Sequence, residues 1–127
     1  MKKKVLFIEN DDAIRHIVAL ILEEQGFNTL SITEPANLNE VIDFHPDVIL
    51  LDEFINSQPG HRLCLKIKKI EGLKHLPVII LSTSNDIELI AKECEANDYI
   101  RKPFDVDDMV NKVVSIVNRH SLAANSH

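Results

Sequence analysis

Residues that can bind a cation or act as a nucleophile follow four short apolar runs of the chain. In chain order these residues are Glu9 and Asn10, then Asp52, then Ser82, and finally Lys102. If the four runs are strands of one parallel sheet, their carboxyl ends meet at one edge, which is where such sheets bind ligands. The spacing therefore predicts that carboxylates, a hydroxyl and an ammonium gather at a single site.

This combination of side chains has the chemistry of phosphoryl transfer to a carboxylate. Clustered carboxylates attract a hard divalent cation such as Mg2+, and its oxygen ligands can come from Asp52, Glu9, Asn10 and a backbone carbonyl. A carboxylate beside Mg2+ can attack phosphorus and form an aspartyl phosphate. The Lys102 ammonium and the Ser82 hydroxyl can then stabilise charge on the transferring oxygens. Taken singly, each of these residues is more often a helix cap or a turn residue, so the prediction depends on their joint appearance.

Strands and helices must alternate to position these residues. Buried strands are predicted at residues 4–8, 27–32, 47–51, 78–81 and 98–100. Apolar residues recur at helical spacing over residues 14–22, 38–42, 63–70, 87–94 and 109–117. Asp11 or Asp12 can cap the first helix and Gly26 can end it. Five strands alternating with five helices predict an α/β fold with a parallel sheet covered on both faces.

The composition is that of one globular domain. Of the 127 residues, 45% are hydrophobic and 5% aromatic, so the core must be mostly aliphatic. The net charge of −6 argues against direct binding to nucleic acid. No apolar run is long enough for a secretory signal or a membrane span, which predicts a cytoplasmic protein. We expect one domain over residues 1–120 with a polar, frayed tail over 121–127, and we expect Cys64 and Cys94 to be reduced, packed thiols.

The chain resembles a response-regulator receiver domain over residues 3–118. The resemblance is carried by Val5-Leu6-Phe7-Ile8-Glu9-Asn10-Asp11, by residues 46–52 and 76–82, and most specifically by Ala96-Asn97-Asp98-Tyr99-Ile100-Arg101-Lys102-Pro103-Phe104. It implies a flavodoxin-like, doubly wound, five-stranded parallel sheet of strand order 2-1-3-4-5 with five helices.

The resemblance also implies a role for each site residue. Asp52 matches the phospho-acceptor, and Glu9 and Asn10 match the pair that holds Mg2+. The backbone carbonyl of Phe54 matches a further metal ligand. The remaining matches are Ser82 as switch hydroxyl, Lys102 as phosphate-pairing lysine, Tyr99 as switch aromatic, and Lys102–Pro103 as a cis peptide.

By the same resemblance, the chain is expected to be a signalling module of a two-component or phosphorelay system. It would catalyse only its own phosphoryl transfer and dephosphorylation. The expected donor is a sensor histidine kinase or a phosphotransfer protein. A downstream target protein or a second copy of the chain would bind the face formed by the fourth helix, fifth strand and fifth helix. Residues up to 117 are followed by no effector domain in this sequence, which fits either a stand-alone regulator or a piece of a larger protein.

Four residues depart from the family pattern. Asn10 stands where a carboxylate normally contacts Mg2+, and an amide oxygen is a neutral, weaker ligand. Glu53 replaces a usual apolar residue, Asn56 a common proline and Glu95 a common glycine. These departures leave open a degenerate receiver, which would act as an interaction module without phosphorylation.

Two enzyme-like alternatives share parts of this pattern. A haloacid-dehalogenase-type phosphatase also uses an Asp after a strand, but needs a second acid two residues later, where this chain has Phe54. A flavodoxin-like flavin protein shares the architecture but needs a phosphate-binding loop after the first strand. Residues 9–11 do not resemble one.

Overall fold

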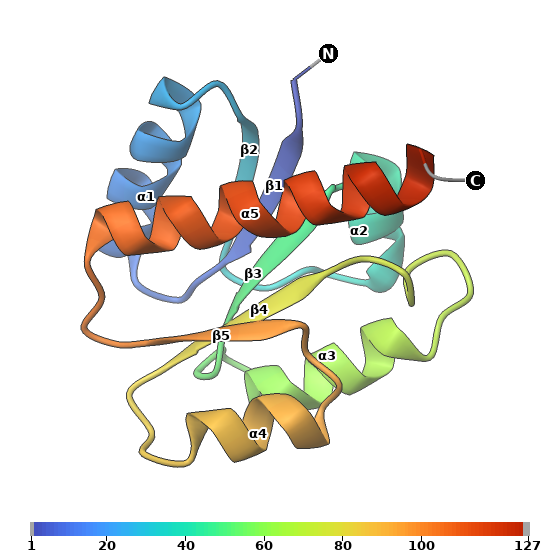
Figure 1. Cartoon of the computed structure of the whole chain (residues 1–127). Coiled ribbons are helices and arrows are strands. Elements are labelled where there is room, and N and C mark those ends of the chain that lie inside the picture. The colour runs from blue at the N-terminus through green and yellow to red at the C-terminus, as the bar shows by residue number, and fades with distance from the viewer. Residues whose placement is uncertain (1, 126–127) are drawn as a thin grey trace.

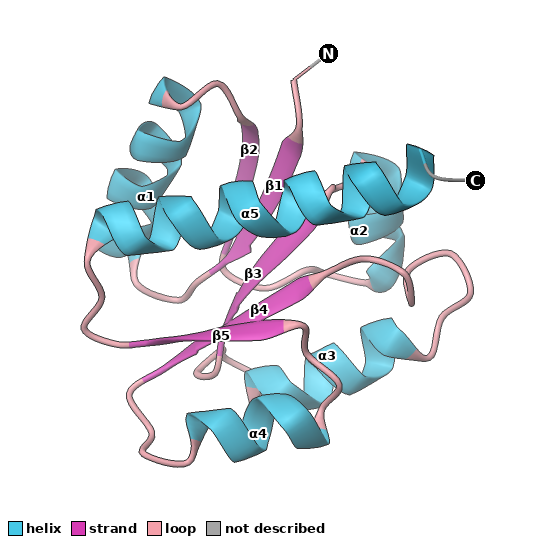
Figure 2. Cartoon of the chain, in the orientation of Figure 1, coloured by secondary structure: helices cyan, strands magenta, loops and turns pink. Residues whose placement is uncertain are grey.

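A computed structural model describes the backbone of residues 2–125 and the side chains of residues 2–119. Within that range five strands and five helices alternate along the chain (Figures 1 and 2). The strands are β1 (Lys4–Ile8), β2 (Asn28–Ile32), β3 (Val48–Asp52), β4 (Val78–Ser82) and β5 (Asp98–Arg101). The helices are α1 (Asp12–Glu24), α2 (Leu38–Phe44), α3 (Gly60–Lys68), α4 (Ile87–Glu93) and α5 (Val106–Asn125).

All neighbouring strands pair in parallel, in the order β2-β1-β3-β4-β5. This confirms the predicted fold class and strand order. The register pairs Asp52 with Leu81 and Ser82 with Arg101. The last residues of β3, β4 and β5 therefore follow one another across the sheet, with Ile8 of β1 beside Leu51.

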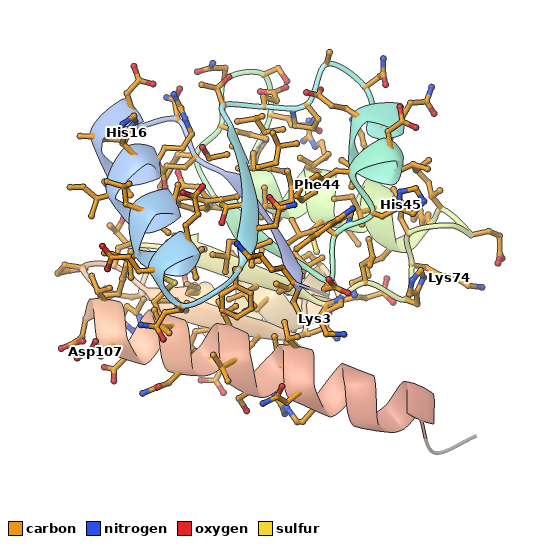
Figure 3. All side chains as sticks on the ribbon, turned by 90° about the horizontal axis from the view of Figure 1, so that it is seen from above. Lys3, His16, Phe44, His45, Lys74 and Asp107 are labelled. Carbon is orange, nitrogen blue, oxygen red and sulfur yellow. The ribbon has the colours of Figure 1, made fainter. Side chains whose placement is uncertain are left out.

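The helices cover both faces of the sheet (Figure 1). One layer of buried side chains joins the sheet to α1 and α5, and the other joins it to α2, α3 and α4. Figure 3 shows the side chains that fill these layers. The side chains of β3 and β4 are buried throughout, which explains why these strands are uninterrupted apolar runs.

Helix ends follow from local sequence. Asp11, rather than Asp12, caps α1, because its Oδ1 accepts a hydrogen bond of 3.1 Å from the backbone N of Ile14. Gly26 follows α1 with a φ of 93°, a conformation that favours glycine. After α4 the same left-handed region is occupied by Glu95, with a φ of 64°. The two cysteines are free and buried, as predicted.

Two predicted helix ends are wrong. Helix α3 ends at Lys68, so Ile70 lies in a turn that brings the chain back toward β4. In this turn the backbone N of Lys74 donates a hydrogen bond to Ile70 O. Helix α5 continues to Asn125, through the start of the predicted frayed tail at Ser121. The reason is that Leu122, Ala123 and Ala124 are good helix formers and no Gly or Pro interrupts them. Residues 126–127 and the side chains from residue 120 onward lie outside the described residues.

Candidate functional site

The predicted residues meet at the carboxyl ends of β1, β3, β4 and β5. Asp52 and Ser82 are the last residues of β3 and β4, while Glu9 and Lys102 are the first residues after β1 and β5. The backbone of Lys102 is tied to the neighbouring strand, because its N–H donates to Ser82 O over 2.8 Å. The Lys102–Pro103 peptide is cis, as the resemblance implied. The sheet therefore brings together four residues that are distant in sequence.

A buried ammonium joins two buried carboxylates at the centre of this site. Lys102 Nζ lies 2.7 Å from Asp52 Oδ1 and 3.0 Å from Glu9 Oε2. The side chains of Asp52 and Glu9 are 4% and 3% exposed, and that of Lys102 is 16% exposed. Such a pair is weakly screened by solvent, so its charges interact strongly. The second Glu9 oxygen, Oε1, accepts a hydrogen bond from the backbone N of Asp11.

The charges of this trio depend on one another. Burial raises the pKa of Glu9, and the nearby Asp52 charge raises it further, although hydrogen bonds from Lys102 and Asp11 act in the opposite direction. Burial acts to lower the pKa of Lys102, but its close contacts with the Asp52 and Glu9 carboxylates outweigh that effect, so the pKa is raised. The pKa shift of Glu9 thus comes mainly from burial and that of Lys102 from its two carboxylate partners.

Asp52 Oδ1 is short of hydrogen bonds despite the close ammonium. The oxygen is buried and accepts no hydrogen bond of adequate geometry, so its 2.7 Å contact with Lys102 is an ion pair without hydrogen-bond alignment. A buried carboxylate oxygen without a hydrogen bond is costly unless another group uses it. The arrangement leaves this atom able to accept a cation or form a bond.

The oxygen donors at this edge suit Mg2+. Among the described residues no group of three or more His, Cys, Asp or Glu can hold a metal ion, so Glu9 and Asp52 would need further oxygen ligands. Asn10 follows Glu9 and is exposed at the same edge, and the Phe54 carbonyl lies two residues beyond Asp52. Mg2+ takes few protein carboxylates and keeps several waters. A site with two buried acids and an orphaned Asp52 oxygen fits that ion.

Ser82 lies on β4, the strand next to that of Asp52, and Tyr99 lies on β5, one strand further across the sheet. The Ser82 side chain is fully buried, and its Oγ accepts a hydrogen bond of 3.0 Å from the backbone N of Ser84. Tyr99, on β5, is half-buried against the layer that contains α3 and α4. Its ring centroid lies 5.5 Å from Lys112 Nζ on α5, and Lys112 pairs with Asp98 over 3.0 Å.

The loop between β3 and α3 contains residues whose importance the sequence prediction missed. Gly60 starts α3, and a Cβ on it would lie 2.1 Å from Asp52 O, so only glycine allows this close approach. Glu53 Oε1 and His61 Nδ1 are in contact across the loop. By residue type, the segment 56–60 is typical of a turn, and its sequence gives no sign of how closely Gly60 approaches Asp52 O. Phe54 is 64% exposed, which leaves its backbone as the part that can serve the site.

Known proteins with related sequences agree with this geometry. Residues 5–114 match the response regulator receiver domain family. KdpE, a transcriptional regulatory protein of Staphylococcus aureus, is 38% identical over 113 residues, which cover 86% of this chain and 47% of KdpE. The Escherichia coli phosphate regulon transcriptional regulatory protein PhoB is 27% identical over 124 residues, covering 95% of this chain and 54% of PhoB. The chain thus spans about half the length of the curated relatives it matches.

Solved structures show the same architecture. NtrX from Brucella abortus is 27% identical with a TM-score of 0.86, and the match covers 99% of this chain and 29% of NtrX. A CheY-like response regulator receiver domain protein from Methanospirillum hungatei shares the fold with a TM-score of 0.87 at 20% identity, covering 97% of this chain and 99% of that one. Helices capable of crossing a membrane are absent from the described residues. The family match over residues 5–114 and these relatives show that the chain belongs to the receiver-domain family of two-component response regulators.

Proposed function

We propose that Asp52 accepts a phosphoryl group in a Mg2+-dependent step of a two-component or phosphorelay pathway. One observation carries the proposal: Asp52 Oδ1 is buried without a hydrogen bond, 2.7 Å from the Lys102 ammonium. A structural carboxylate at a strand end would normally have its oxygens satisfied by backbone N–H groups. A nucleophile needs one oxygen free and a cation nearby.

In the proposed transfer, an Asp52 oxygen forms a bond to phosphorus while the bond from phosphorus to the donor breaks. The leaving group departs with the electron pair of that bond. Bound Mg2+ supplies neutralisation of charge on the phosphoryl oxygens. Lys102 stays within reach of those oxygens because its backbone is tied to Ser82 O and its ammonium already contacts Asp52. Attack of water on the acyl phosphate restores Asp52, so the chain would catalyse only its own transfer and hydrolysis.

Intact mass measurement tests the nucleophile. A small phosphodonor such as acetyl phosphate, given with Mg2+, should add one phosphoryl group to the wild-type chain and none to Asp52→Asn. Omission of Mg2+ should suppress the labelling of the wild type. Equal labelling of both proteins would refute the assignment of Asp52, and a wild type that takes no phosphate would favour the degenerate receiver.

The proposed output is a change at the face formed by α4, β5 and α5. A phosphoryl group on Asp52 brings charge and acceptor oxygens, and the Ser82 hydroxyl could leave Ser84 N to donate to them. That movement would alter the space beside Tyr99, whose ring now lies near Lys112. The phosphate shifts an existing balance of conformers, by as much as it favours one of them.

Amide hydrogen exchange with and without beryllofluoride tests this switch. Exchange should change across α4 and β5 as well as beside Asp52, and a change confined to residues near Asp52 would contradict the output face. The proposed upstream partner is a sensor histidine kinase or a phosphotransfer protein in the cytoplasm. The proposed downstream partner is a target protein or a second copy of the chain.

A further inference from the structure

A buried carboxylate stands directly after the candidate nucleophile. Glu53 is 7% exposed, and both of its side-chain oxygens face His61. Oε2 accepts a hydrogen bond of 3.0 Å from the backbone N of His61, and Oε1 contacts the ring Nδ1. The side chain of His61 is 39% exposed, so the pair joins a buried acid to a residue at the surface.

This pair closes the loop that follows Asp52. The backbone of Glu53 is fixed on both sides, because its N–H donates to Leu81 O over 2.8 Å and its O accepts from Gly60 N over 2.7 Å. Within the loop, Phe54 and Pro59 form an isolated antiparallel bridge. Residues 53–61 are thus a closed loop, with Glu53 anchored to β4 at one end and His61 anchored to α3 at the other.

The side chains of the loop differ in burial: Ile55 is 9% exposed and packs in the layer with α3 and α4, whereas Phe54 and residues 56–57 are exposed. An open groove of about 490 Å³ is bordered by Glu53, Phe54, Ser82 and Ile90, so the loop faces solvent on that side. The Phe54 ring is 64% exposed and cannot anchor the loop by burial. Further polar contacts, from Ser57 to Glu34 and from Lys66 to Gln58, lie at the exposed tip. Buried attachments therefore lie on both sides of the Phe54 carbonyl: the Ile55 side chain in the core, and the Glu53–His61 contact on the side of Asp52.

We propose that His61 is a positioning residue for the metal-binding edge: through Glu53 it holds residues 53–59, and with them the Phe54 carbonyl, in the geometry that Mg2+ needs. The proposal rests on the proposed function, in which Mg2+ binds beside Asp52. An apolar residue after Asp52 would secure the loop by packing alone. A carboxylate at this position needs the His61 side chain as partner, because a buried acid that lacks a hydrogen bond is more stable in water. Movement of the Glu53 side chain toward water would displace the loop.

Three variants separate positioning from general stability. His61→Ala removes the ring donor, and His61→Asn keeps an N–H donor near the position of Nδ1. His75→Ala is the matched control, since His75 is an exposed histidine just before β4, at the sheet edge opposite Asp52. In the metal-free chains, amide exchange of residues 53–60 should be faster in His61→Ala than in the wild type. His61→Asn and His75→Ala should exchange as the wild type does.

Calorimetric titration with Mg2+ gives the second readout. His61→Ala should bind Mg2+ about tenfold more weakly, which corresponds to about 1.4 kcal/mol and lies within the usual cost of removing one partner of a buried polar group. His61→Asn should recover most of that affinity. Unchanged Mg2+ affinity in His61→Ala, or equal loss in His61→Asn, would overturn the proposal. If His61→Ala does not fold, the comparison of His61→Asn with His61→Leu takes its place, with the same expected difference.

These readouts also separate the inference from the proposed function. Loop exchange and Mg2+ affinity are measured without a phosphodonor, so they stand if Asp52 takes no phosphate. If the proposed function is wrong, by contrast, the wild type takes no phosphoryl group, and this result does not depend on His61. Labelled wild type together with unchanged Mg2+ binding in His61→Ala would leave Asp52 as nucleophile and remove the role of His61.

Discussion

Replacement of Lys102 by Met removes the one cation that the structure places between Glu9 and Asp52. The Nζ atom lies 3.0 Å from one carboxylate and 2.7 Å from the other, and all three side chains are at least four-fifths buried. At an effective dielectric near 20, each contact is worth about 6 kcal/mol of Coulomb attraction before desolvation is subtracted. Breaking a buried pair by removing one partner costs about 3–5 kcal/mol, because an uncompensated charge is left behind. We expect Lys102→Met to lower the free energy of unfolding by about 3 kcal/mol without Mg2+.

The pH dependence of this loss distinguishes electrostatics from packing. Burial already raises the folded-state pKa of Glu9 above its ordinary value, and Lys102 is a group that opposes this. Without Lys102 the pKa of Glu9 must rise further. A raised folded-state pKa favours folding at low pH, and this advantage is lost as the pH rises through the folded-state value. The deficit of Lys102→Met against the wild type should therefore be largest near neutral pH and should shrink as the pH falls through the pKa of Glu9.

Urea denaturation at several pH values measures both effects. Lys74→Met is the control, because Lys74 pairs with the exposed Glu71, and such surface pairs contribute about 0–1 kcal/mol. The reasoning is refuted if Lys102→Met is as stable as Lys74→Met near neutral pH. It is equally refuted if its deficit does not change with pH, since a lost packing contact would give a constant difference.

Four other substitutions test the site and its frame. Asn10→Asp should tighten Mg2+ binding at least about fivefold, since a ligand charge near the ion contributes on the order of 1 kcal/mol or more; titration that shows no gain would mean that residue 10 does not face the ion. Glu95→Gly should raise stability by about 0.5–1 kcal/mol in thermal unfolding, because Glu95 has a left-handed φ of 64° that strains a non-glycine residue. Gly26→Ala, at a φ of 93°, should lower stability for the same reason. A stability change of the same sign in both variants would contradict the argument from backbone strain. Gly60→Ala should lower both stability and phosphate labelling, since its Cβ would lie 2.1 Å from Asp52 O; a fully stable variant that labels normally would show that the backbone yields at little cost.

The sheet and the central trio were predictable because their signals are local. Apolar runs identify β1, β3 and β4, and a parallel sheet brings whatever follows them to one edge. Glu9, Asp52 and Lys102 were predicted as neighbours on that basis, although Lys102 and Glu9 are 93 positions apart in the chain. The cis peptide at Lys102–Pro103 came from the resemblance and is confirmed.

Other features depend on three-dimensional context. Glu53 was noted only as a departure from the family pattern, because its partner His61 lies eight positions later, across a loop whose path cannot be read from residue types. Gly60 was read as a turn residue, since the close approach to Asp52 O exists only once α3 docks on the sheet. The ends of α3 and α5 were wrong because periodicity describes the buried face of a helix, and helix ends depend on turns and on residues outside that face.

The charge balance of the trio links the Asn10 substitution to the role of Lys102. Two buried carboxylates and one ammonium leave a single net negative charge, to which Asn10 adds none. Bound Mg2+ would therefore compete with the Lys102 ammonium for the negative charge of Glu9 and Asp52. A phosphoryl group on Asp52 brings about −1.5 to −2 charges and gives Lys102 a partner of its own, which would release carboxylate oxygens to the ion. Because coupling between two ligands is reciprocal, a phosphate analogue should tighten Mg2+ binding as much as Mg2+ tightens binding of the analogue. This coupling should be stronger in the wild type than in Asn10→Asp, whose additional carboxylate would hold the ion without help from the phosphate.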